Sequence, residues 1–244
     1  MAVRKKGVRG PRAANRRGDS KKRAATRKRK PSAGKQPGKR TAGSDYHHGD
    51  LRKALLQGTE DLLESSGLEG FTLREVARRA GVSHGAPAHH FGDVRGLLSE
   101  FTAQSFSDMA AAMAQHRERA DADAFEQLVA TGVAYVEYAL AHRARFQLMF
   151  RSDRLDRSQE SLVEAGAKAY GHLVECTTRV AFEAGTPDRM VDEKIALAWS
   201  MVHGFATLLL DNAKFAEQVE GDPARALGML RYMLDLSRPA FEAR

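Results

Sequence analysis

The stretch from Thr72 to Phe91 limits the fold more than any other part of the sequence, because it carries the signals for two short helices around one glycine. Thr72 and Glu75 have the spacing of a capping box, in which each side chain binds the backbone N–H of the other residue. Gly81 permits the left-handed backbone of a tight turn. We therefore expect a first short helix after Thr72. Its apolar face is formed by Leu73, Val76, Ala77 and Ala80.

A second short helix is expected after the turn. Ser83 is expected to cap this helix, which is expected to run to about His90. Pro87 lies near its first turn, where a missing N–H costs little. Two short helices that meet at small residues form a helix-turn-helix, whose second helix fits the major groove of DNA. Helix pairs of this kind also occur in bundles that do not bind DNA.

The sequence around this motif is helical as well. The preceding helix carries one apolar stripe, and Gly67 marks its end. That stripe consists of Leu51, Ala54, Leu55, Leu62 and Leu63. Asp93 is expected to cap a fourth helix, and apolar residues recur at helical spacing in the rest of the chain. The sequence therefore predicts an all-α protein. A helix-turn-helix domain at residues 45–92 is joined by the fourth helix to a larger helical domain at residues 93–244.

Charge separates the first 44 residues from the remainder. Residues 1–44 carry 17 Lys and Arg against a single acid, Asp19, whereas residues 45–244 carry 22 Lys and Arg against 30 Asp and Glu. The first segment contains no Leu, Ile, Phe, Trp or Tyr, so it cannot offset its ordering entropy and is expected to be a disordered tail. Its densest cations are Lys21, Lys22, Arg23, Arg27, Lys28, Arg29 and Lys30. Such blocks favour DNA or RNA as a partner, and a merely solubilising tail is the alternative.

Composition excludes several classes of protein. Cys176 is the single cysteine, which excludes an internal disulfide, and no apolar run approaches the roughly 18 residues of a membrane span. Without a secretory signal, the chain is expected to be cytoplasmic. The sequence has no glycine-rich phosphate loop, paired-carboxylate signature or nucleophile elbow. We therefore expect no enzymatic activity, no metal and no cofactor.

Residues 46–98 resemble the DNA-binding domain of the tetracycline-repressor (TetR) family of bacterial transcriptional regulators. The resemblance is carried above all by the run from Gly81 to Pro87, followed by His90 and Phe91. Trp199 and the pair His203-Gly204 resemble the variant whose C-terminal domain is named for its Trp, His and Gly residues. The resemblance covers residues 45–244 and leaves out the tail. It implies a nine-helix protomer, a homodimer and a repressor controlled by a ligand.

The resemblance also implies which residues lie near DNA. They are Thr72, Ser83, His84, Gly85, His89 and His90. The second short helix has no Arg, Lys, Asn or Gln, so it lacks the usual bidentate readers of guanine and adenine. His84 and His89 can still make single hydrogen bonds, while Gly85 and Ala86 permit close approach. Ala88 and Val94 stand where the family usually has an aromatic residue and a lysine that contact phosphate.

Cations on the neighbouring helices are candidates for phosphate contacts, with a solvated helix face as the alternative. They are Arg52, Lys53, Arg74, Arg78, Arg79 and Arg95. The second short helix has no Lys or Arg, whereas the tail is strongly cationic. We therefore hypothesise that the two parts have different roles in DNA binding. The folded domain supplies register and modest specificity, and residues 1–44 supply much of the affinity.

Methionine and aromatic side chains of the larger domain suggest a pocket for a small, largely apolar effector. The candidates are Phe106, Met109, Met113, Phe146, Met149, Tyr170, Trp199 and His203. Ordinary core packing is the alternative for any one of them. Tyr170 or His203 can orient a polar group of the ligand.

The last two helices are expected at about residues 191–215 and 223–237. The first is apolar on more than one face and therefore needs two partners. The resemblance implies that both pair with their copies in a four-helix bundle across a twofold axis, which matches a palindromic operator. Two other interpretations stay open. One is an architectural, nucleoid-associated DNA binder without effector control, and the other is a helical small-molecule-binding protein or enzyme.

Overall fold

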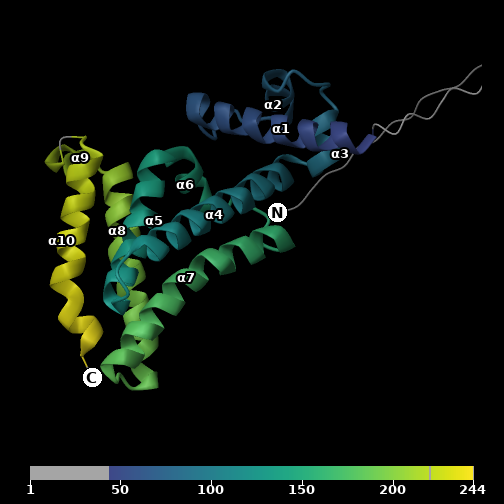
Figure 1. Cartoon of the computed structure of the whole chain (residues 1–244). Coiled ribbons are helices and arrows are strands. Elements are labelled where there is room, and N and C mark those ends of the chain that lie inside the picture. Colours follow the sequence, from purple (N-terminus) through teal and green to yellow (C-terminus); the bar gives the residue numbers. More distant parts are fainter. Residues whose placement is uncertain (1–43, 220, 244) are drawn as a thin grey trace, which may run out of the picture. The chain divides into compact units, whose positions relative to one another are not determined.

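A computed structural model describes residues 44–219 and 221–243, which belong to one compact unit spanning residues 42–244. The predicted basic tail, with its cations between Lys21 and Lys30, lies outside the described residues. Within the described part the fold consists of helices without a strand, which confirms the all-α prediction (Figure 1). Its elements are α1 (Ser44–Ser66), α2 (Leu73–Arg79), α3 (Ala86–Phe91), α4 (Val94–Arg119), α5 (Ala124–Ala141), α6 (Arg143–Met149), α7 (Glu160–Ala184), the 3₁₀ helix η1 (Asp188–Met190), α8 (Val191–Asp211), α9 (Ala213–Gln218) and α10 (Pro223–Glu242).

Short polar side chains fix the starts of the helices that position the motif. The Thr72 hydroxyl accepts from the Glu75 backbone N–H at 3.2 Å, so α2 begins where predicted. The Asp93 carboxylate accepts from the Gly96 N–H at 2.8 Å and starts α4. Gly67 ends α1 with a positive φ of 66°. Three of the predicted helix boundaries are therefore confirmed.

Two local predictions are wrong. Ser83 does not cap α3, which begins at Ala86; the Ser83 carbonyl instead accepts from the Ala86 N–H within the preceding turn. Pro87 explains the later start, because proline is best tolerated in the first turn of a helix. The capping box is also only half formed. The Glu75 carboxylate accepts from the Arg78 guanidinium at 2.5 and 2.9 Å rather than turning back toward Thr72.

The C-terminal part is divided more finely than expected. The described residues contain ten α-helices where the resemblance implied nine. The helix predicted at about 191–215 ends at Asp211, and Asn212 caps the separate α9 by accepting from the Phe215 N–H at 3.1 Å. Asparagine favours such caps over helix interiors, because its side chain competes for backbone N–H groups.

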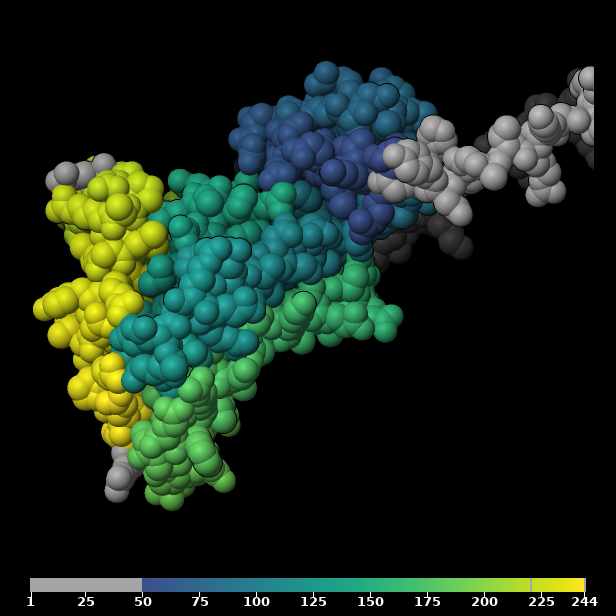
Figure 2. All heavy atoms as spheres, in the orientation of Figure 1, coloured from purple at the N-terminus to yellow at the C-terminus, as the bar shows by residue number. Residues whose placement is uncertain are grey.

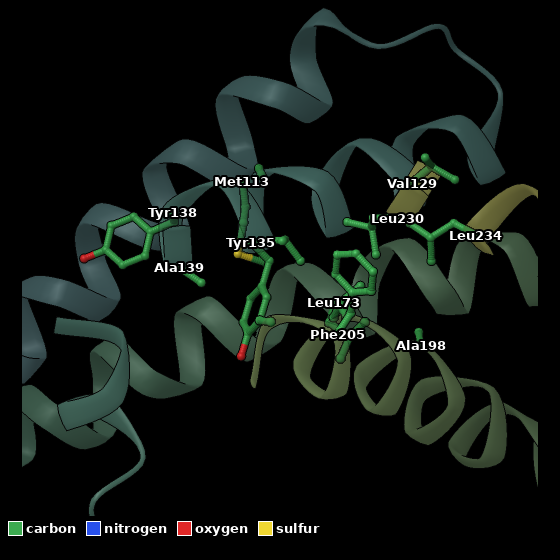
Figure 3. Packing of buried hydrophobic residues seen from close by; sticks show 14 of the residues in the cluster. Met113, Val129, Tyr135, Tyr138, Ala139, Leu173, Ala198, Phe205, Leu230 and Leu234 are labelled. Carbon is green, nitrogen blue, oxygen red and sulfur yellow. The ribbon is translucent and has the colours of Figure 1, made fainter. Parts of the chain in front are cut away.

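Three hydrophobic clusters hold the described part together. The smallest consists of Leu55, Leu62, Val76 and Leu97, so the first turn of α4 completes the core of the helix-turn-helix domain. A second cluster contains Leu63 of α1, Phe101 of α4 and Leu148 of α6, and it packs these three helices together. The largest fills the C-terminal helices. Figure 3 shows members of this cluster from α4, α5, α7, α8 and α10 around one centre.

A buried lysine fastens the end of α10 to α8. Lys194 is 5% exposed, and its ammonium group donates to the carbonyl oxygens of Phe241 at 2.6 Å and Ala243 at 2.7 Å. The Thr186 hydroxyl also accepts from this ammonium group. The last carbonyl groups of a helix lack hydrogen-bond donors within the helix, and at the end of α10 the Lys194 ammonium group is that donor.

Gly96 provides a test of how tightly α3 turns into α4. A Cβ atom at Gly96 would lie 2.1 Å from the Phe91 carbonyl oxygen, which is backbone and cannot swing away. We expect Gly96→Ala to lower the free energy of unfolding by about 1–3 kcal/mol, as overpacking does. Thermal unfolding followed by circular dichroism measures the change. Gly171→Ala in α7 is the control, because a Cβ there meets nothing within 4 Å and should be neutral or stabilising.

Candidate DNA interface and effector cavity

The helix-turn-helix presents its turn and α3 to solvent because its other side is packed against α1. Val76 and Ala77 of α2 are completely buried. Gly58 permits the close approach, since a Cβ atom there would lie 3.1 Å from the Val76 carbonyl oxygen. The sequence analysis did not identify Gly58, because a glycine inside a helical stripe gives no sign of which helix crosses it.

The residues predicted to lie near DNA fall on this outer surface in most cases. Thr72, Ser83, His84, Gly85 and His89 are exposed, whereas Ala86 and His90 are partly buried. The ring of His90 lies 6.2 Å from that of Phe91, which packs against the core of the domain. Ser83, His84 and Gly85 belong to the turn before α3, and only His89 and His90 are carried by the helix itself.

The predicted phosphate contacts divide into paired and unpaired cations. Arg52 pairs with Glu100 of α4, Arg78 pairs with Glu75, and Arg95 lies 3.5 Å from the Asp153 carbonyl oxygen. Arg74 and Lys53 are exposed, and neither has an ion-pair partner in the described part of the chain. Few cations of the folded domain are therefore free to meet phosphate.

A cavity of about 420 Å³ lies inside the C-terminal helices, between α4, α5, α7, α8 and α10. Six of the eight predicted effector residues line it: Phe106, Met109, Met113, Met149, Tyr170 and Trp199. Phe146 and His203 do not reach its surface. They stand behind Phe150, whose ring lies 5.1 Å from Phe146 and 4.4 Å from His203. The sequence analysis missed the lining residues of α5, among them Phe125, Leu128 and Tyr135.

A chain of polar groups lies in the otherwise apolar wall. The Tyr135 hydroxyl is 2.8 Å from Nδ1 of His203, and the His203 ring lies 6.0 Å from the Trp199 ring. Burial raises the pKa of Tyr135 and lowers the pKa of His203, so both are neutral near pH 7. The sequence analysis named Trp199 and His203 but missed Tyr135, although a tyrosine within an apolar helical stripe is a signal, since a buried hydroxyl needs a partner.

A partly buried cluster of charges connects this region with the DNA-binding domain. Arg145 of α6 donates to both carboxylate oxygens of Glu60 on α1 at 2.6 Å, and to Asp108 of α4 at 2.8 Å. The guanidinium also lies 5.2 Å from the centre of the Phe101 ring. Burial alone would lower the pKa of Arg145, but the Glu60 carboxylate keeps it above its usual value. We call Arg145, Glu60 and Asp108 the interdomain triad.

The described residues contain no group of three His, Cys, Asp or Glu side chains that could hold a metal ion. No helix in that part of the chain is long and apolar enough to cross a bilayer.

Comparisons with known proteins point to one family. A family model described as "Bacterial regulatory proteins, tetR family" matches residues 55–101, which include the helix-turn-helix. A second, described as "Tetracyclin repressor-like, C-terminal domain", matches residues 128–233, which include most of the cavity.

Curated relatives match over about a third of the chain. The chain is 40% identical over 72 residues to the HTH-type transcriptional regulator BetI of Burkholderia thailandensis, covering 29% of this chain and 37% of that protein. It is 36% identical over 86 residues to BetI of Paraburkholderia phytofirmans, covering 35% and 44%. The match thus spans less than half the length of these relatives.

Solved structures match over a larger share. A protein of unknown function from a Rhodococcus species is 31% identical, with a TM-score of 0.64, over 82% of this chain and 97% of that one. The TetR family transcriptional regulator PfmR from Thermus thermophilus is 20% identical, with a TM-score of 0.58, over 76% and 94%. At that identity the second likeness concerns the fold alone.

The lowered pKa of His203 predicts how stability depends on pH. Below about pH 6.5 the unfolded chain takes up a proton on His203 that the folded chain excludes, so stability is lost as the pH falls toward the folded pKa. We expect His203→Gln to make the free energy of unfolding less sensitive to pH between 7 and 5. Urea unfolding at several pH values measures this slope. Exposed His89→Gln is the control, and equal slopes for His203→Gln and the unaltered chain would contradict the prediction.

Proposed function

Because the chain belongs to the TetR family of bacterial regulatory proteins, we propose that it is a cytoplasmic, DNA-binding transcriptional repressor controlled by a small apolar effector. The observation that carries this proposal is that the same chain has both a surface suited to DNA and a cavity suited to a ligand. It has an outward-facing helix-turn-helix and an apolar cavity, joined by α4 and by the interdomain triad. A purely architectural DNA binder would not need such a cavity.

The DNA interface is proposed to be the turn and α3, together with cations around them. Arg52, Thr72, Arg74 and Arg95 would contact the backbone, and the residues from Ser83 to Ala86 with His89 and His90 would enter the groove. A histidine makes single hydrogen bonds to base edges, where arginine would make two. Modest base recognition is therefore supplemented by the tail, whose cations from Lys21 to Lys30 would neutralise phosphates.

A homodimer is proposed to form through α8 and α10. From Ile195 to Leu210, α8 contains no charged side chain, although Leu197 and Leu208 are exposed on it. On α10, Tyr232 and Leu236 are more than 60% exposed. Figure 2 shows α10 at the surface of the described part. Apolar rows facing water on two neighbouring helices favour burial against the same rows of a second copy.

Effector control is proposed to pass through α4 and α6. Phe106, Met109 and Met113 on α4 line the cavity, and so does Met149 on α6. Both helices also hold the interdomain triad, which reaches Glu60 on α1. A ligand that shifts α4 or α6 must therefore move the DNA-binding domain or break the triad. Regulation needs a coupling of only about 1–3 kcal/mol.

We propose that the turn and α3 recognise bases and that the tail adds affinity. This is tested on an operator isolated by selecting bound genomic fragments. Replacing the seven tail cations from Lys21 to Lys30 by Gln should weaken binding to operator and random duplex alike. It should also make the salt slope shallower, by up to about 5 if six of them contact phosphate. His89→Ala should weaken only operator binding, by about tenfold. Fluorescence anisotropy at several salt concentrations measures both.

Lys168→Gln with Lys214→Gln is the control for cations lost outside the tail, since both lysines are exposed on C-terminal helices. A footprint with two half-sites is expected from the dimer. Unchanged affinity and slope after the tail substitutions would refute the role of the tail. Equal binding to operator and random duplex by the unaltered chain would refute specific recognition.

The strength of the interdomain triad is tested by a double-mutant cycle. Glu60→Gln or Arg145→Met alone should lower the free energy of unfolding by about 2–3 kcal/mol, because each leaves a largely buried group without its partner. The double variant should lose clearly less than the sum. The more exposed pair of Arg117 and Glu175, at 2.7 Å, is the control and should show a coupling of at most about 1 kcal/mol.

Chemical denaturation of the four proteins in each cycle gives the coupling energies. Additive losses at Glu60 and Arg145 would mean that the triad is too weak to carry regulation between the domains.

A further inference from the structure

We infer that the effector is an elongated apolar molecule with a single carboxylate, and that Arg157 binds this carboxylate. The inference rests on the proposed function, because it names the ligand class of the same cavity. Arg157 is the one charged side chain among the described residues that line the cavity. The others are apolar, apart from hydroxyl groups and the indole of Trp199.

The lining residues extend along the helices rather than around a compact hollow. On α5 they run from Phe125 to Tyr135, which is about 15 Å at the rise of an α-helix. On α7 they run over a similar length, from Leu162 to Leu173. A slot of this length with apolar walls fits an alkyl chain better than a compact polar metabolite.

Within the described part of the chain no side chain occupies the Arg157 guanidinium, in contrast to several arginines of the C-terminal helices. Arg145, Arg179, Arg231 and Arg238 each pair with a carboxylate. Arg157 is exposed, and it has no ion-pair or hydrogen-bond partner in the described part of the chain. A guanidinium presents two parallel N–H donors that match the two oxygens of a carboxylate.

The net charge of the folded part does not explain a preference for an anionic ligand. Residues 45–244 carry 22 Lys and Arg against 30 Asp and Glu, so an anion is not drawn to the folded part by its net charge. A ligand that prefers its anionic form must therefore owe that preference to a particular group, and Arg157 is the cation in the cavity wall.

The position of Arg157 also links it to the DNA-binding domain. The neighbouring Asp156 N–H donates to the Ser99 hydroxyl of α4 at 2.7 Å, and Gln159 donates to the Glu100 carboxylate at 2.8 Å. Glu100 in turn pairs with Arg52 of α1. A carboxylate held by Arg157 thus acts on a segment that is hydrogen-bonded to α4, next to the ion pair that joins α4 to α1.

The inference is tested by binding of three probes that share one chain and differ in their head group. These are dodecanoate, dodecanol and dodecyltrimethylammonium, each below its aggregation concentration. Trp199 is the single tryptophan and lines the cavity, so its fluorescence reports occupancy directly. We expect the full chain to bind dodecanoate about tenfold more tightly than dodecanol, and the cation most weakly.

Arg157→Gln should remove this tenfold preference and leave dodecanol binding unchanged. Arg189→Gln is the matched control, because Arg189 is an exposed arginine of η1 outside the cavity lining. Equal binding of dodecanoate and dodecanol by the unaltered chain would overturn the inference. So would a preference for dodecanoate that survives Arg157→Gln.

Binding of the operator, with and without dodecanoate, separates this inference from the proposed function. If the chain binds dodecanoate through Arg157 but no operator, the repressor proposal fails and the ligand class stands. If it binds operator but shows no preference for the carboxylate, the ligand class fails and the repressor proposal stands.

Discussion

The guanidinium of Arg145 is the group on which the relation between the two domains depends. A cation withdrawn from water is costly unless carboxylates surround it, and here one carboxylate comes from α1 and the other from α4. The DNA-binding domain therefore cannot rotate away from α6 without leaving a largely buried charge unpaired. Leu63, Phe101 and Leu148 add an apolar seam beside the triad. The seam resists separation in any direction, whereas the triad selects one geometry.

This arrangement explains why a modest change in the cavity can matter at the DNA surface. Interior packing is close to crystalline, so helices that share a core shift as units and transmit displacement. Helix α4 carries cavity residues in its middle and Leu97 of the DNA-binding core in its first turn. The same helix is thus part of both domains, and the boundary predicted between residues 92 and 93 falls just before a turn that belongs to the first core.

Local signals predicted the helices well where one side chain decides the outcome. Thr72 and Asp93 fixed two helix starts, and Gly67 fixed an end, because caps depend on neighbours in sequence. Ser83 misled because Pro87 competes for the same helix start. The cavity was predicted only in part, since methionine and aromatic residues mark apolar walls but not which of them face inward. Arg157 could not be predicted, because it lies between α6 and α7 where no periodicity places a side chain.

The fastening of α10 by Lys194 has a consequence for the size of molecule that the cavity accepts. The ammonium group holds the carbonyls of Phe241 and Ala243, and Phe241 belongs to the cavity lining, where its ring lies 5.9 Å from that of Phe125. Lys194 therefore fixes the position of one part of the cavity wall. A related protein that lacks a lysine here would have a less firmly held wall, and we expect it to accept a wider range of ligands.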